Sequence, residues 1–493
     1  MSQSLFKFEH SYAEKLEGFY VDWDADKAKA PELIRFNSTL ANALGLDLEK
    51  VEDQTLAEWF SGNEKPEGAH TLAQVYAGHQ FGGFSPQLGD GRALLIGEVV
   101  TPQSERFDIQ LKGSGRTPFS RGGDGKAAIG PVLREYLMAE AMHALGVPTT
   151  RALAAVKTGD YVFRDRPLPG AVLTRVASSH VRVGTFQFFA SRGEMEKVRQ
   201  LADYVIWRHY PELADTDDKY CMLLEQVCER QALLVGKWMS FGFIHGVMNT
   251  DNMTLSGETI DYGPCAFMDH YDPKTVFSSI DEQGRYAYGN QPVLAQWNLA
   301  RLAECLVPLM DENREKAIEK ATRIIEGFSD LYDASWTEAM RAKLGLSTAL
   351  EGDQALAKGF LQTMDGQSVD FTLAFRNLAK VLRDNDNDNA LREQYQVTAL
   401  LDPWLEKWRE RIALETGLSS DERANQMDMV NPLYIPRNHK VEEALAAAAD
   451  GDMTLFDALF DVLQSPFVVQ RGQEAYAEPD PEGGVNFQTF CGT

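Results

Sequence analysis

Two patterns of hydrophobic residues follow one another along the chain. From residue 72 to 177, short apolar segments alternate with glycine-rich loops, which is typical of strands. Residues 92–100 (RALLIGEVV) and 106–113 (RFDIQLKG) each predict a strand, and 161–176 (YVFRDRPLPGAVLTRV) predicts a hairpin that leads into a further strand. One helix interrupts this region, because residues 132–145 (VLREYLMAEAMHAL) carry apolar side chains at helical spacing.

After about residue 180 the pattern becomes mostly helical. Residues 219–239 (KYCMLLEQVCERQALLVGKWM) are apolar on more than one face and predict a buried helix, while 297–310 (WNLARLAECLVPLM) carry one apolar stripe. Between them, residues 255–269 (LSGETIDYGPCAFMD) predict a short pair of strands. The chain is therefore expected to have an α+β fold, with a small strand-rich part that holds one key helix and a larger helical part.

Three segments are expected from these changes of pattern. Residues 1–70 are mixed but favour helix, and they predict an N-terminal extension that packs on the rest. Residues 71–177 form the strand-rich part with its glycine loops. Residues 178–493 form the helical part, which ends in a helical extension and a mobile tail rich in Pro and Gly.

Composition excludes several classes of protein. Of 493 residues, 44% are hydrophobic and 25% charged, as in globular proteins, and the formal net charge is −25. A nucleic acid is not expected as a partner, because its phosphate backbone requires a basic surface. No apolar run reaches the length of a membrane span. The first twenty residues include three glutamates, unlike a leader peptide, so we expect a cytoplasmic protein with no membrane partner.

Cysteine spacing and one acidic run predict no resident zinc, disulfide framework or calcium site. The five cysteines are odd in number and form no C-x-x-C pair. Residues 383–390 (RDNDNDNA) resemble the start of a calcium-binding EF-hand loop. However, Asn389 stands where such a loop needs Gly, and Tyr395 stands where it needs the closing Glu. We interpret this run as a solvated loop.

Glycine-rich loops are the first candidate binding features. The segment FGGFSPQLGDGRALL (81–95) could bring backbone N–H groups close to phosphates, or it could be a β-hairpin with its turn at Asp90-Gly91. A second loop has six glycines in residues 113–130, interleaved with Arg116, Arg121 and Lys126, and it ends where a helix begins. Long glycine loops in compact domains are functional or disordered, and the basic residues here favour an anion site.

Further charged residues occur in the order found in protein kinases. Lys112 ends a predicted strand 23 residues before Glu135 of the predicted helix, and in kinases such a Glu orients a phosphate-binding Lys. His245 and Asn252 have the seven-residue spacing of the kinase catalytic loop, and Asp261 of a D-Y-G sequence follows nine residues later. An Asn and an Asp so placed can share one Mg²⁺.

The kinase catalytic acid is absent from this loop. The position two residues after His245, where kinases carry the Asp that accepts the substrate proton, is Val247. Each charged residue taken singly could be a solvated side chain or part of a turn, and only their common order favours a nucleotide site. The loop then belongs either to an inactive kinase or to an enzyme of a different reaction.

With these residues assembled, the chain resembles the selenoprotein O (SelO/YdiU) family of protein-kinase-like proteins. The blocks that carry the resemblance are YAGHQFGGFSPQLGDGRA, LKGSGRTPFSRGGDGKAA, LTRVASSHVR and HGVMNTDNMTLSGETIDYGPCAF, with NPLYIPRNHKVEEAL near residue 431. The resemblance implies a bilobed, kinase-like fold that binds ATP in a flipped orientation and transfers AMP to Ser, Thr or Tyr hydroxyls of proteins.

Matching positions also imply roles for individual residues. Asp251 matches the catalytic base, Glu135 matches the residue that orients the Lys, and Asn252 and Asp261 match the ligands of Mg²⁺ or Mn²⁺. The residues that match the ATP-binding set are Gly89, Gly91, Arg92, Lys112, Asp124, Gly125, Arg175, Arg182 and Asp261. Some eukaryotic relatives carry selenocysteine where this chain has Cys491, but the segment HYDPKTVFSSID (270–281) after Cys265 contains no obvious cysteine to pair with it.

Two other functions stay open at this point. A conventional phosphotransferase could use Asp251 as a displaced base. A nucleotide-binding pseudokinase scaffold without catalysis would explain Val247. In each case ATP and a divalent metal are the expected small-molecule partners, and adenylyl transfer to proteins is the function that the resemblance implies.

Overall fold

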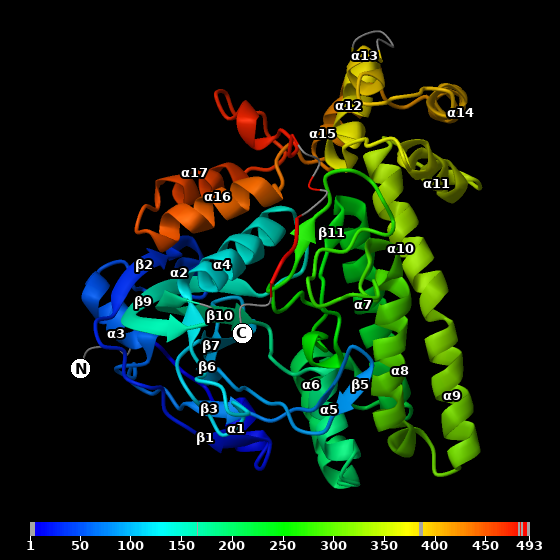
Figure 1. The fold of residues 1–493 in the computed structure, drawn as a ribbon. Helices are drawn as coiled ribbons and strands as arrows, with labels where there is room; N and C mark the ends of the chain where they lie inside the picture. Colours follow the sequence, from blue (N-terminus) through cyan, green and yellow to red (C-terminus); the bar gives the residue numbers. More distant parts are fainter. Residues whose placement is uncertain (1–4, 165, 384–387, 482–483, 485–486, 491–493) are drawn as a thin grey trace.

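The computed structural model describes residues 5–164, 166–383, 388–481, 484 and 487–490. It has an α+β fold in which a strand-rich part, blue to cyan in Figure 1, lies beside a larger helical part. The α+β class predicted from the sequence is confirmed. The two parts share one hydrophobic core, which runs from the sheet into the long helices.

An antiparallel sheet of eight strands forms the strand-rich part. Its order is β1-β3-β6-β7-β10-β9-β2, with β8 beside β10, and the pairs β4–β5 and β11–β12 stand apart from it. The strands are β1 Tyr20–Asp22, β2 Glu32–Phe36, β3 Leu72–Gln74, β4 Gly78–Gln80, β5 Gly83–Ser85, β6 Ala93–Val100, β7 Arg106–Lys112, β8 Ala127–Ala128, β9 Arg151–Phe163, β10 Pro167–Ala177, β11 Phe243–Ile244 and β12 Ala266–Phe267. The two predicted strands are β6 and β7, and the predicted hairpin is β9–β10, so these predictions are confirmed.

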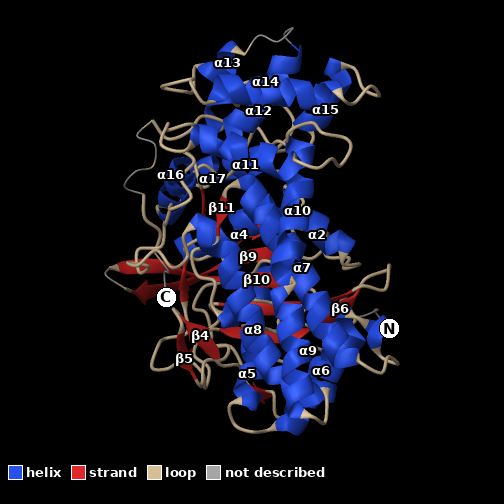
Figure 2. Ribbon diagram, turned by 90° about the vertical axis from the view of Figure 1, so that its right-hand side faces the viewer, coloured by secondary structure: helices blue, strands red, loops and turns tan. Residues whose placement is uncertain are grey.

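Helices make up most of the remaining chain, and α7 to α10 stand side by side (Figure 2). The helices are α1 Ser11–Lys15, α2 Ser38–Ala43, α3 Asp53–Ser61, α4 Ile129–Ala144, α5 Val183–Ala190, α6 Met195–His209, α7 Lys219–Phe241, α8 Gln291–Met310, α9 Arg314–Glu326, α10 Phe328–Lys343, α11 Asp353–Met364, α12 Phe371–Arg383, α13 Asn389–Arg392, α14 Leu401–Ala413, α15 Ser420–Asp428, α16 Asn438–Ala449 and α17 Thr454–Leu463. The predicted helices correspond to α4, α7 and α8.

The central strands separate a hydrophobic layer from a polar one. Ile109 and Leu111 of β7 pack with residues of α2 and α3 in one buried cluster. The intervening side chains, Gln110 and Lys112, face the opposite side, where Lys112 meets Glu135 of α4. This alternation is the ordinary consequence of the two-residue period of a strand. It places a row of polar groups on the face of the sheet that looks toward the helical part.

The first seventy residues supply both edges of the sheet. β1 pairs with β3 at one edge, and β2 pairs with β9 at the other. α2 and α3 cover the apolar face described above. This segment therefore helps to hold the strands that carry the polar row.

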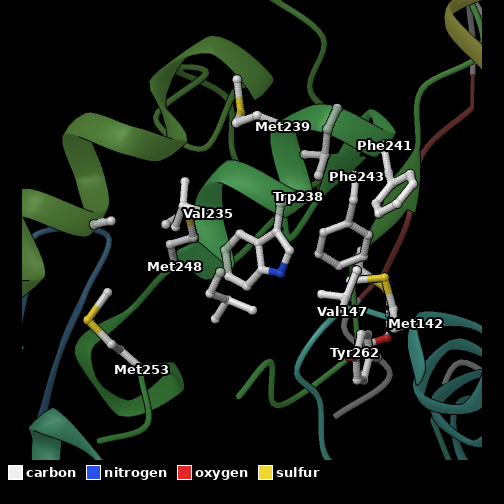
Figure 3. Packing of buried hydrophobic residues seen from close by; sticks show 14 of the residues in the cluster. Met142, Val147, Val235, Trp238, Met239, Phe241, Phe243, Met248, Met253 and Tyr262 are labelled. Carbon is white, nitrogen blue, oxygen red and sulfur yellow. Dashed lines mark hydrogen bonds between the residues drawn. The ribbon is translucent and has the colours of Figure 1, made fainter. Parts of the chain in front are cut away.

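The loop after α7 is supported by a packed aromatic core (Figure 3). The indole N–H of Trp238 donates to the Thr259 hydroxyl at 2.9 Å, and its ring lies 5.6 Å from that of Phe243 and 5.4 Å from that of His245. Met248 and Met253 are also buried in this cluster. Close packing thus fixes one side of the loop from 245 to 253. Polar side chains of the loop at Asn249, Thr250 and Asp251 contact the β4–β5 hairpin.

The strand pair predicted within residues 255–269 is wrong. Among the described residues of this segment only β12 is a strand, and it pairs with β11, which lies before the loop rather than within the segment. The chain instead makes two isolated bridges, Thr254 to Arg182 and Thr259 to Thr149. A two-residue strand is too short to show a periodicity in the sequence. The backbone of this segment is instead hydrogen-bonded to distant parts of the chain through the two bridges.

The C-terminal helices α16 and α17 lie against α4, as Figure 1 shows. Arg437, at the start of α16, is fully buried and donates to Asp269 and Asp370 at 2.5 and 2.6 Å. Arg134 of α4 donates to Glu442 of α16 at 3.1 Å and also to the carbonyl oxygens of Gly263 and Cys265. These contacts tie α4 both to α16 and to the D-Y-G segment.

No helix within the described ranges is both long and apolar enough to cross a membrane. Cys221, Cys228, Cys265 and Cys305 are buried in the hydrophobic core and free of disulfides. Cys491 and residues 384–387 of the acidic run lie outside the described residues, as does part of the tail.

One buried amine opposes folding at neutral pH. The Lys343 side chain at the end of α10 is 3% exposed and lies within 6 Å of the rings of Phe241, Phe371 and Phe375. Burial lowers the pKa of Lys343 from 10.5 to about 7. Between these two values the unfolded chain binds more protons than the folded one, so stability rises with pH across this window and is lost as pH falls through it.

Replacing Lys343 by Met is therefore expected to raise the melting temperature by a few degrees at pH 6 to 7 and to change it little near pH 10. The ring contacts of the ammonium recover about 1–2 kcal/mol, less than the desolvation that the lowered pKa reflects. Thermal unfolding at pH 6, 7.5 and 10 measures the effect, with the exposed Lys380→Met as the matched control. Equal or lower stability of K343M at pH 6 would contradict the prediction.

Candidate active site

Lys112 and Glu135 form an ion pair between the sheet and α4. The Lys112 Nζ lies 2.6 Å from Glu135 Oε2, and both residues are less than 10% exposed. The pairing follows from local structure, since Lys112 is on the polar face of β7 and Glu135 is in the second turn of α4. The same Nζ lies 2.6 Å from Asp261 Oδ1. The structure thus brings together three residues of the candidate site, Lys112, Glu135 and Asp261.

Two arginines from neighbouring segments converge on the same carboxylate. Arg175 of β10 places Nη1 2.8 Å from Asp261 Oδ1 and 3.2 Å from Glu135 Oε1. Arg182, just before α5, places Nη1 3.1 Å from Asp261 Oδ2. Asp261 thus accepts from three cations. Burial alone would raise the pKa of Asp261, but Lys112, Arg175 and Arg182 hold it well below its usual range.

The Asp261 backbone is itself unusual. Its φ of 65° lies in the left-handed region, which residues with a side chain rarely adopt. His245 supports the preceding residue, because its Nδ1 accepts from the Val247 N–H and its Nε2–H then donates to the Ile260 carbonyl at 2.9 Å. Residues held in such conformations concentrate at functional sites. The strain is sustained here by the three cations on the carboxylate and by His245.

Asp251 lies next to this cluster on a single turn of 3-10 helix, Thr250–Asn252. Its backbone carbonyl accepts from Arg182 Nη1 at 2.9 Å, so one arginine joins Asp251 to Asp261. The Asp251 Oδ2 accepts from Gln80 Nε2 at 3.2 Å, while Oδ1 is buried with no hydrogen-bond partner among the described residues. Burial raises the pKa of Asp251 to about 6, against the attraction of Arg182. A buried carboxylate with one free oxygen is suited to accept a proton.

The β4–β5 hairpin covers the Asp251 loop. The His79 N–H donates to the Thr250 hydroxyl at 2.7 Å, and the Phe81 N–H donates to Asn249 Oδ1 at 3.2 Å. The turn of this hairpin lies at Phe81-Gly82, so the alternative interpretation of residues 81–95, a hairpin with its turn at Asp90-Gly91, is wrong. Asp90 is instead buried and bonded to Gln74 of β3 and Gln110 of β7.

Gly78→Ala is expected to lower activity about a hundred-fold. A Cβ at this position would lie 2.5 Å from Asp251 Oδ1 and 3.0 Å from Leu88 Cδ1, so the carboxylate would have to move. A displacement near 1 Å can cost that much in a positioned reaction. Gly83→Ala in the same hairpin is the matched control, because its Cβ would meet only the Gln80 carbonyl at 3.5 Å. Comparing the catalytic turnover of the two variants tests this, and equal turnover contradicts it.

Asn252 and Asp261 offer the oxygen ligands that Mg²⁺ prefers. The Asn252 Nδ2 donates to the Val247 carbonyl at 3.0 Å, which orients the amide and leaves its Oδ1 available. In the described part of the chain, no three His, Cys, Asp or Glu residues are grouped to hold a metal. The candidate pair fits a metal that takes its remaining ligands from phosphate and water, as nucleotide-bound Mg²⁺ does.

The predicted glycine and loop residues have packing roles of their own. Gly89 and Gly91 face Phe119, with which a Cβ would clash at 2.5 and 2.9 Å. At Gly125 a Cβ would lie 2.0 Å from the Gly115 carbonyl. Asp124 pairs with Arg164 of the β9–β10 hairpin at 2.8 Å. The Gly113 N–H donates to the Arg92 carbonyl at 2.6 Å. Among the described residues, no hydrogen bond or ion pair joins Arg92 or Asp124 to Asp261.

Sequence reasoning missed several polar residues that complete the arrangement. Each of these residues contacts a predicted site residue or its loop, either directly or through one neighbour. They are Gln80, Asp90, Gln110 and Arg134. The only available signal was for Gln110, which is two residues before Lys112 and so faces the same side of β7. Gln80 and Arg134 gave no signal, because their partners are more than a hundred residues away.

Comparison with known proteins agrees with this geometry. A family model described as "Protein adenylyltransferase SelO" matches residues 3–464. The chain belongs to the SelO family. A relative from Cereibacter sphaeroides (strain ATCC 17029 / ATH 2.4.9), called protein nucleotidyltransferase YdiU, is 59% identical over 490 residues, which is 99% of this chain and 100% of that protein.

Two further SelO relatives come from rhizobia. Proteins of the same name from Rhizobium leguminosarum bv. trifolii (strain WSM2304) and Rhizobium meliloti (strain 1021) are each 55% identical over 489 residues. The matches cover 97% and 99% of these two proteins, respectively, and 99% of this chain in both cases. The predicted family is confirmed, and SelO membership makes the chain a nucleotidyltransferase, with ATP as the substrate that this class implies.

Proposed function

We propose that the protein transfers AMP from ATP to Ser, Thr or Tyr hydroxyls of other proteins. In this proposal ATP binds in a flipped orientation, with its α-phosphate rather than its γ-phosphate next to the acceptor, in a kinase-like cleft between the strand-rich part and the helical part. The observation that carries the proposal is the convergence of Lys112, Arg175 and Arg182 on Asp261, with the free oxygen of Asp251 beside them.

Positive side chains of this kind suit a polyphosphate. Lys112 offers a point charge, and Arg175 and Arg182 offer planar sets of donors that match phosphate oxygens. We propose that all three turn from Asp261 to phosphate oxygens when the nucleotide binds, together with Arg92 and the N–H groups of the glycine loops at Gly89, Gly91 and 124–125. Glu135 keeps Lys112 in place during this change, since its contact with Nζ is independent of Asp261.

Asn252 and Asp261 are the residues proposed to hold Mg²⁺ or Mn²⁺. The ion would neutralise charge on the phosphate oxygens and hold them in position. Asp261 can serve as a ligand only when its oxygens are released by the three cations, which fits their transfer to the nucleotide. The orientation of the Asn252 amide supports the role, because its N–H is already engaged by Val247.

Asp251 is proposed as the general base that accepts the proton of the acceptor hydroxyl. Its partly satisfied carboxylate and a pKa raised to about 6 by burial fit a base that works near neutral pH. Val247, which stands where kinases have their base, is 7% exposed, and its apolar side chain cannot accept a proton. Its backbone carbonyl accepts from Asn252, and its N–H donates to His245. The base is thereby moved from the usual kinase position to one beside Asn252, which agrees with attack at a different phosphate.

Labelled ATP separates this proposal from the alternatives. The protein is incubated with Mg²⁺, a mixture of protein acceptors, and ATP labelled at either the α or the γ phosphate. We expect label in protein from the α position and none from the γ position. Label from the γ position alone would establish a conventional phosphotransferase. Binding of ATP without transfer of either label would establish a pseudokinase scaffold, and either result would end the proposal.

A further inference from the structure

Asp90 is a buried carboxylate that faces Arg182 directly and Arg175 through Gln110. Its side chain is 1% exposed, so it cannot touch a bound nucleotide. The Asp90 Oδ2 accepts from the Gln74 N–H and from Gln110 Nε2, both at 3.1 Å. Its Oδ1 has no hydrogen-bond partner within the described chain and lies 3.9 Å from Arg182 Nη2. The carboxylate is thus aimed at Arg182 from the side opposite Asp261.

Gln110 links Asp90 to Arg175 by two hydrogen bonds. The fully buried Gln110 amide donates through Nε2 to Asp90 and accepts through Oε1 from Arg175 Nη2 at 2.6 Å. Both ends of the amide are therefore engaged, and its orientation is determined. The Gln110 amide, which is neutral, therefore couples the orientation of the Asp90 carboxylate to that of the Arg175 guanidinium without adding a charge.

The two arginines are held in the same manner. In each, Nη1 faces Asp261, while Nη2 faces Asp90, directly for Arg182 and through Gln110 for Arg175. Arg182 also stacks on the Tyr76 ring at 4.6 Å. If Asp261 is taken over by the metal and nucleotide, Arg175 keeps Gln110 and Glu135 as partners. Arg182 then keeps Asp90 and the Asp251 carbonyl.

We propose that Asp90, with Gln110 as its link to Arg175, is a positioning residue that orients both arginines toward the polyphosphate. The inference rests on the proposed nucleotide site and goes beyond it, because neither residue touches the nucleotide. Its physical basis is the rotamer freedom of arginine, which must be removed before a guanidinium can bind phosphate in a fixed geometry. The Asp90 anchor removes that freedom before ATP arrives.

The test compares Asp90→Asn with the wild-type protein by calorimetric titration with α,β-methylene-ATP and Mg²⁺ at pH 8. Asn keeps the shape and an oxygen for the Gln74 N–H but removes the charge that attracts Arg182. We expect the Kd of the analogue to rise at least ten-fold. Asp353→Asn is the matched control, since Asp353 is 2% exposed and ion-paired to Arg411 away from the site. It is expected to leave the Kd unchanged.

A double variant distinguishes positioning from general support of the fold. In Asp90→Asn with Gln110→Glu, the negative charge is moved from residue 90 to residue 110, whose side chain accepts from Arg175. We expect the double variant to bind the analogue more tightly than Asp90→Asn alone, because Arg175 gains a charged anchor in place of the one that Arg182 has lost. A purely structural role would lower the melting temperature of the variants without this recovery of affinity.

Three results would overturn the inference. One is a Kd of Asp90→Asn within two-fold of wild type, another is a double variant no better than the single one, and the third is a wild-type protein that does not bind the analogue. A wild-type protein that binds the analogue but transfers no α label would end the proposed function alone. The comparison of Kd values would then still decide whether Asp90 positions the arginines.

Discussion

Asp251→Asn is expected to reduce AMP transfer by about 10²–10⁴-fold while binding of Mg²⁺ and ATP stays close to wild type. The substitution keeps the size of the side chain and removes only its capacity to accept a proton. The backbone carbonyl of residue 251, which accepts from Arg182, is unchanged, so the arginine cluster is preserved. Single-turnover transfer of α-labelled AMP and a titration with α,β-methylene-ATP give the two readouts.

Gln80→Leu is the companion variant. It removes the N–H that donates to Asp251 Oδ2 but leaves the carboxylate in place. Its effect should be far smaller than that of Asp251→Asn, because the base itself is retained. If Asp251→Asn transfers AMP within ten-fold of wild type, Asp251 is not the base. If it loses ATP binding as well, its role is structural.

Asp261→Asn is expected to abolish measurable transfer and also to destabilise the nucleotide-free protein. The carboxylate is the common acceptor of Lys112, Arg175 and Arg182, so a neutral amide leaves three buried cations without their shared counter-charge. Removing one partner from a buried ion pair costs about 3–5 kcal/mol. The variant also loses a proposed metal ligand, and the loss of transfer should exceed about 10³-fold. Thermal unfolding and transfer assays measure the two effects.

The pH dependence of wild-type stability supplies a check on the same carboxylate. A folded-state pKa held well below the ordinary value contributes stability above the unfolded pKa, and this contribution is lost as pH falls through the folded value. Asp261→Asn should therefore be less stable than wild type at pH 7 and approach it under acid conditions. Asp353→Asn serves as the control for general loss of a buried ion pair, since it should lower stability but keep transfer. A stable, inactive Asp261→Asn would contradict the electrostatic account and leave only the metal role.

Much of the fold could be predicted from the chain because long periodic segments determine their own structure. Strong patterns predict β6, β7, α4 and α7 to within about three residues at each end, and they predict α8 except for its first six residues. Lys112 and Glu135 were paired correctly because a strand end and a helix face are predictable positions. Short elements behaved differently. β11 and β12 have two residues each and are formed by tertiary pairing, so the segment around Asp261 could not be assigned from its own sequence.

The unpredicted half of the site consists of contacts between distant segments. Gln80 reaches Asp251 across 171 residues, and Arg134 reaches Gly263 across 129. Gln110 looked like the polar side of a strand, whereas it is a buried link between Asp90 and Arg175. The glycines at 89, 91 and 125 were assigned to phosphate binding from the resemblance, and the structure adds that each also permits a close approach of the chain to itself. Such second roles depend on tertiary packing, which no local pattern encodes.

The cluster around Asp261 is balanced in charge before any nucleotide arrives. Lys112, Arg175 and Arg182 face Glu135, Asp261 and Asp90, three cations against three carboxylates, within a chain whose net charge is −25. A pocket of this kind offers no surplus attraction to free sulfate, phosphate or metal-free ATP, and the long-range field of the chain repels them. We expect the site to bind an anion only when that anion brings its own cation. The charge neutrality of the cluster, rather than its shape, then excludes the many small anions of a cell.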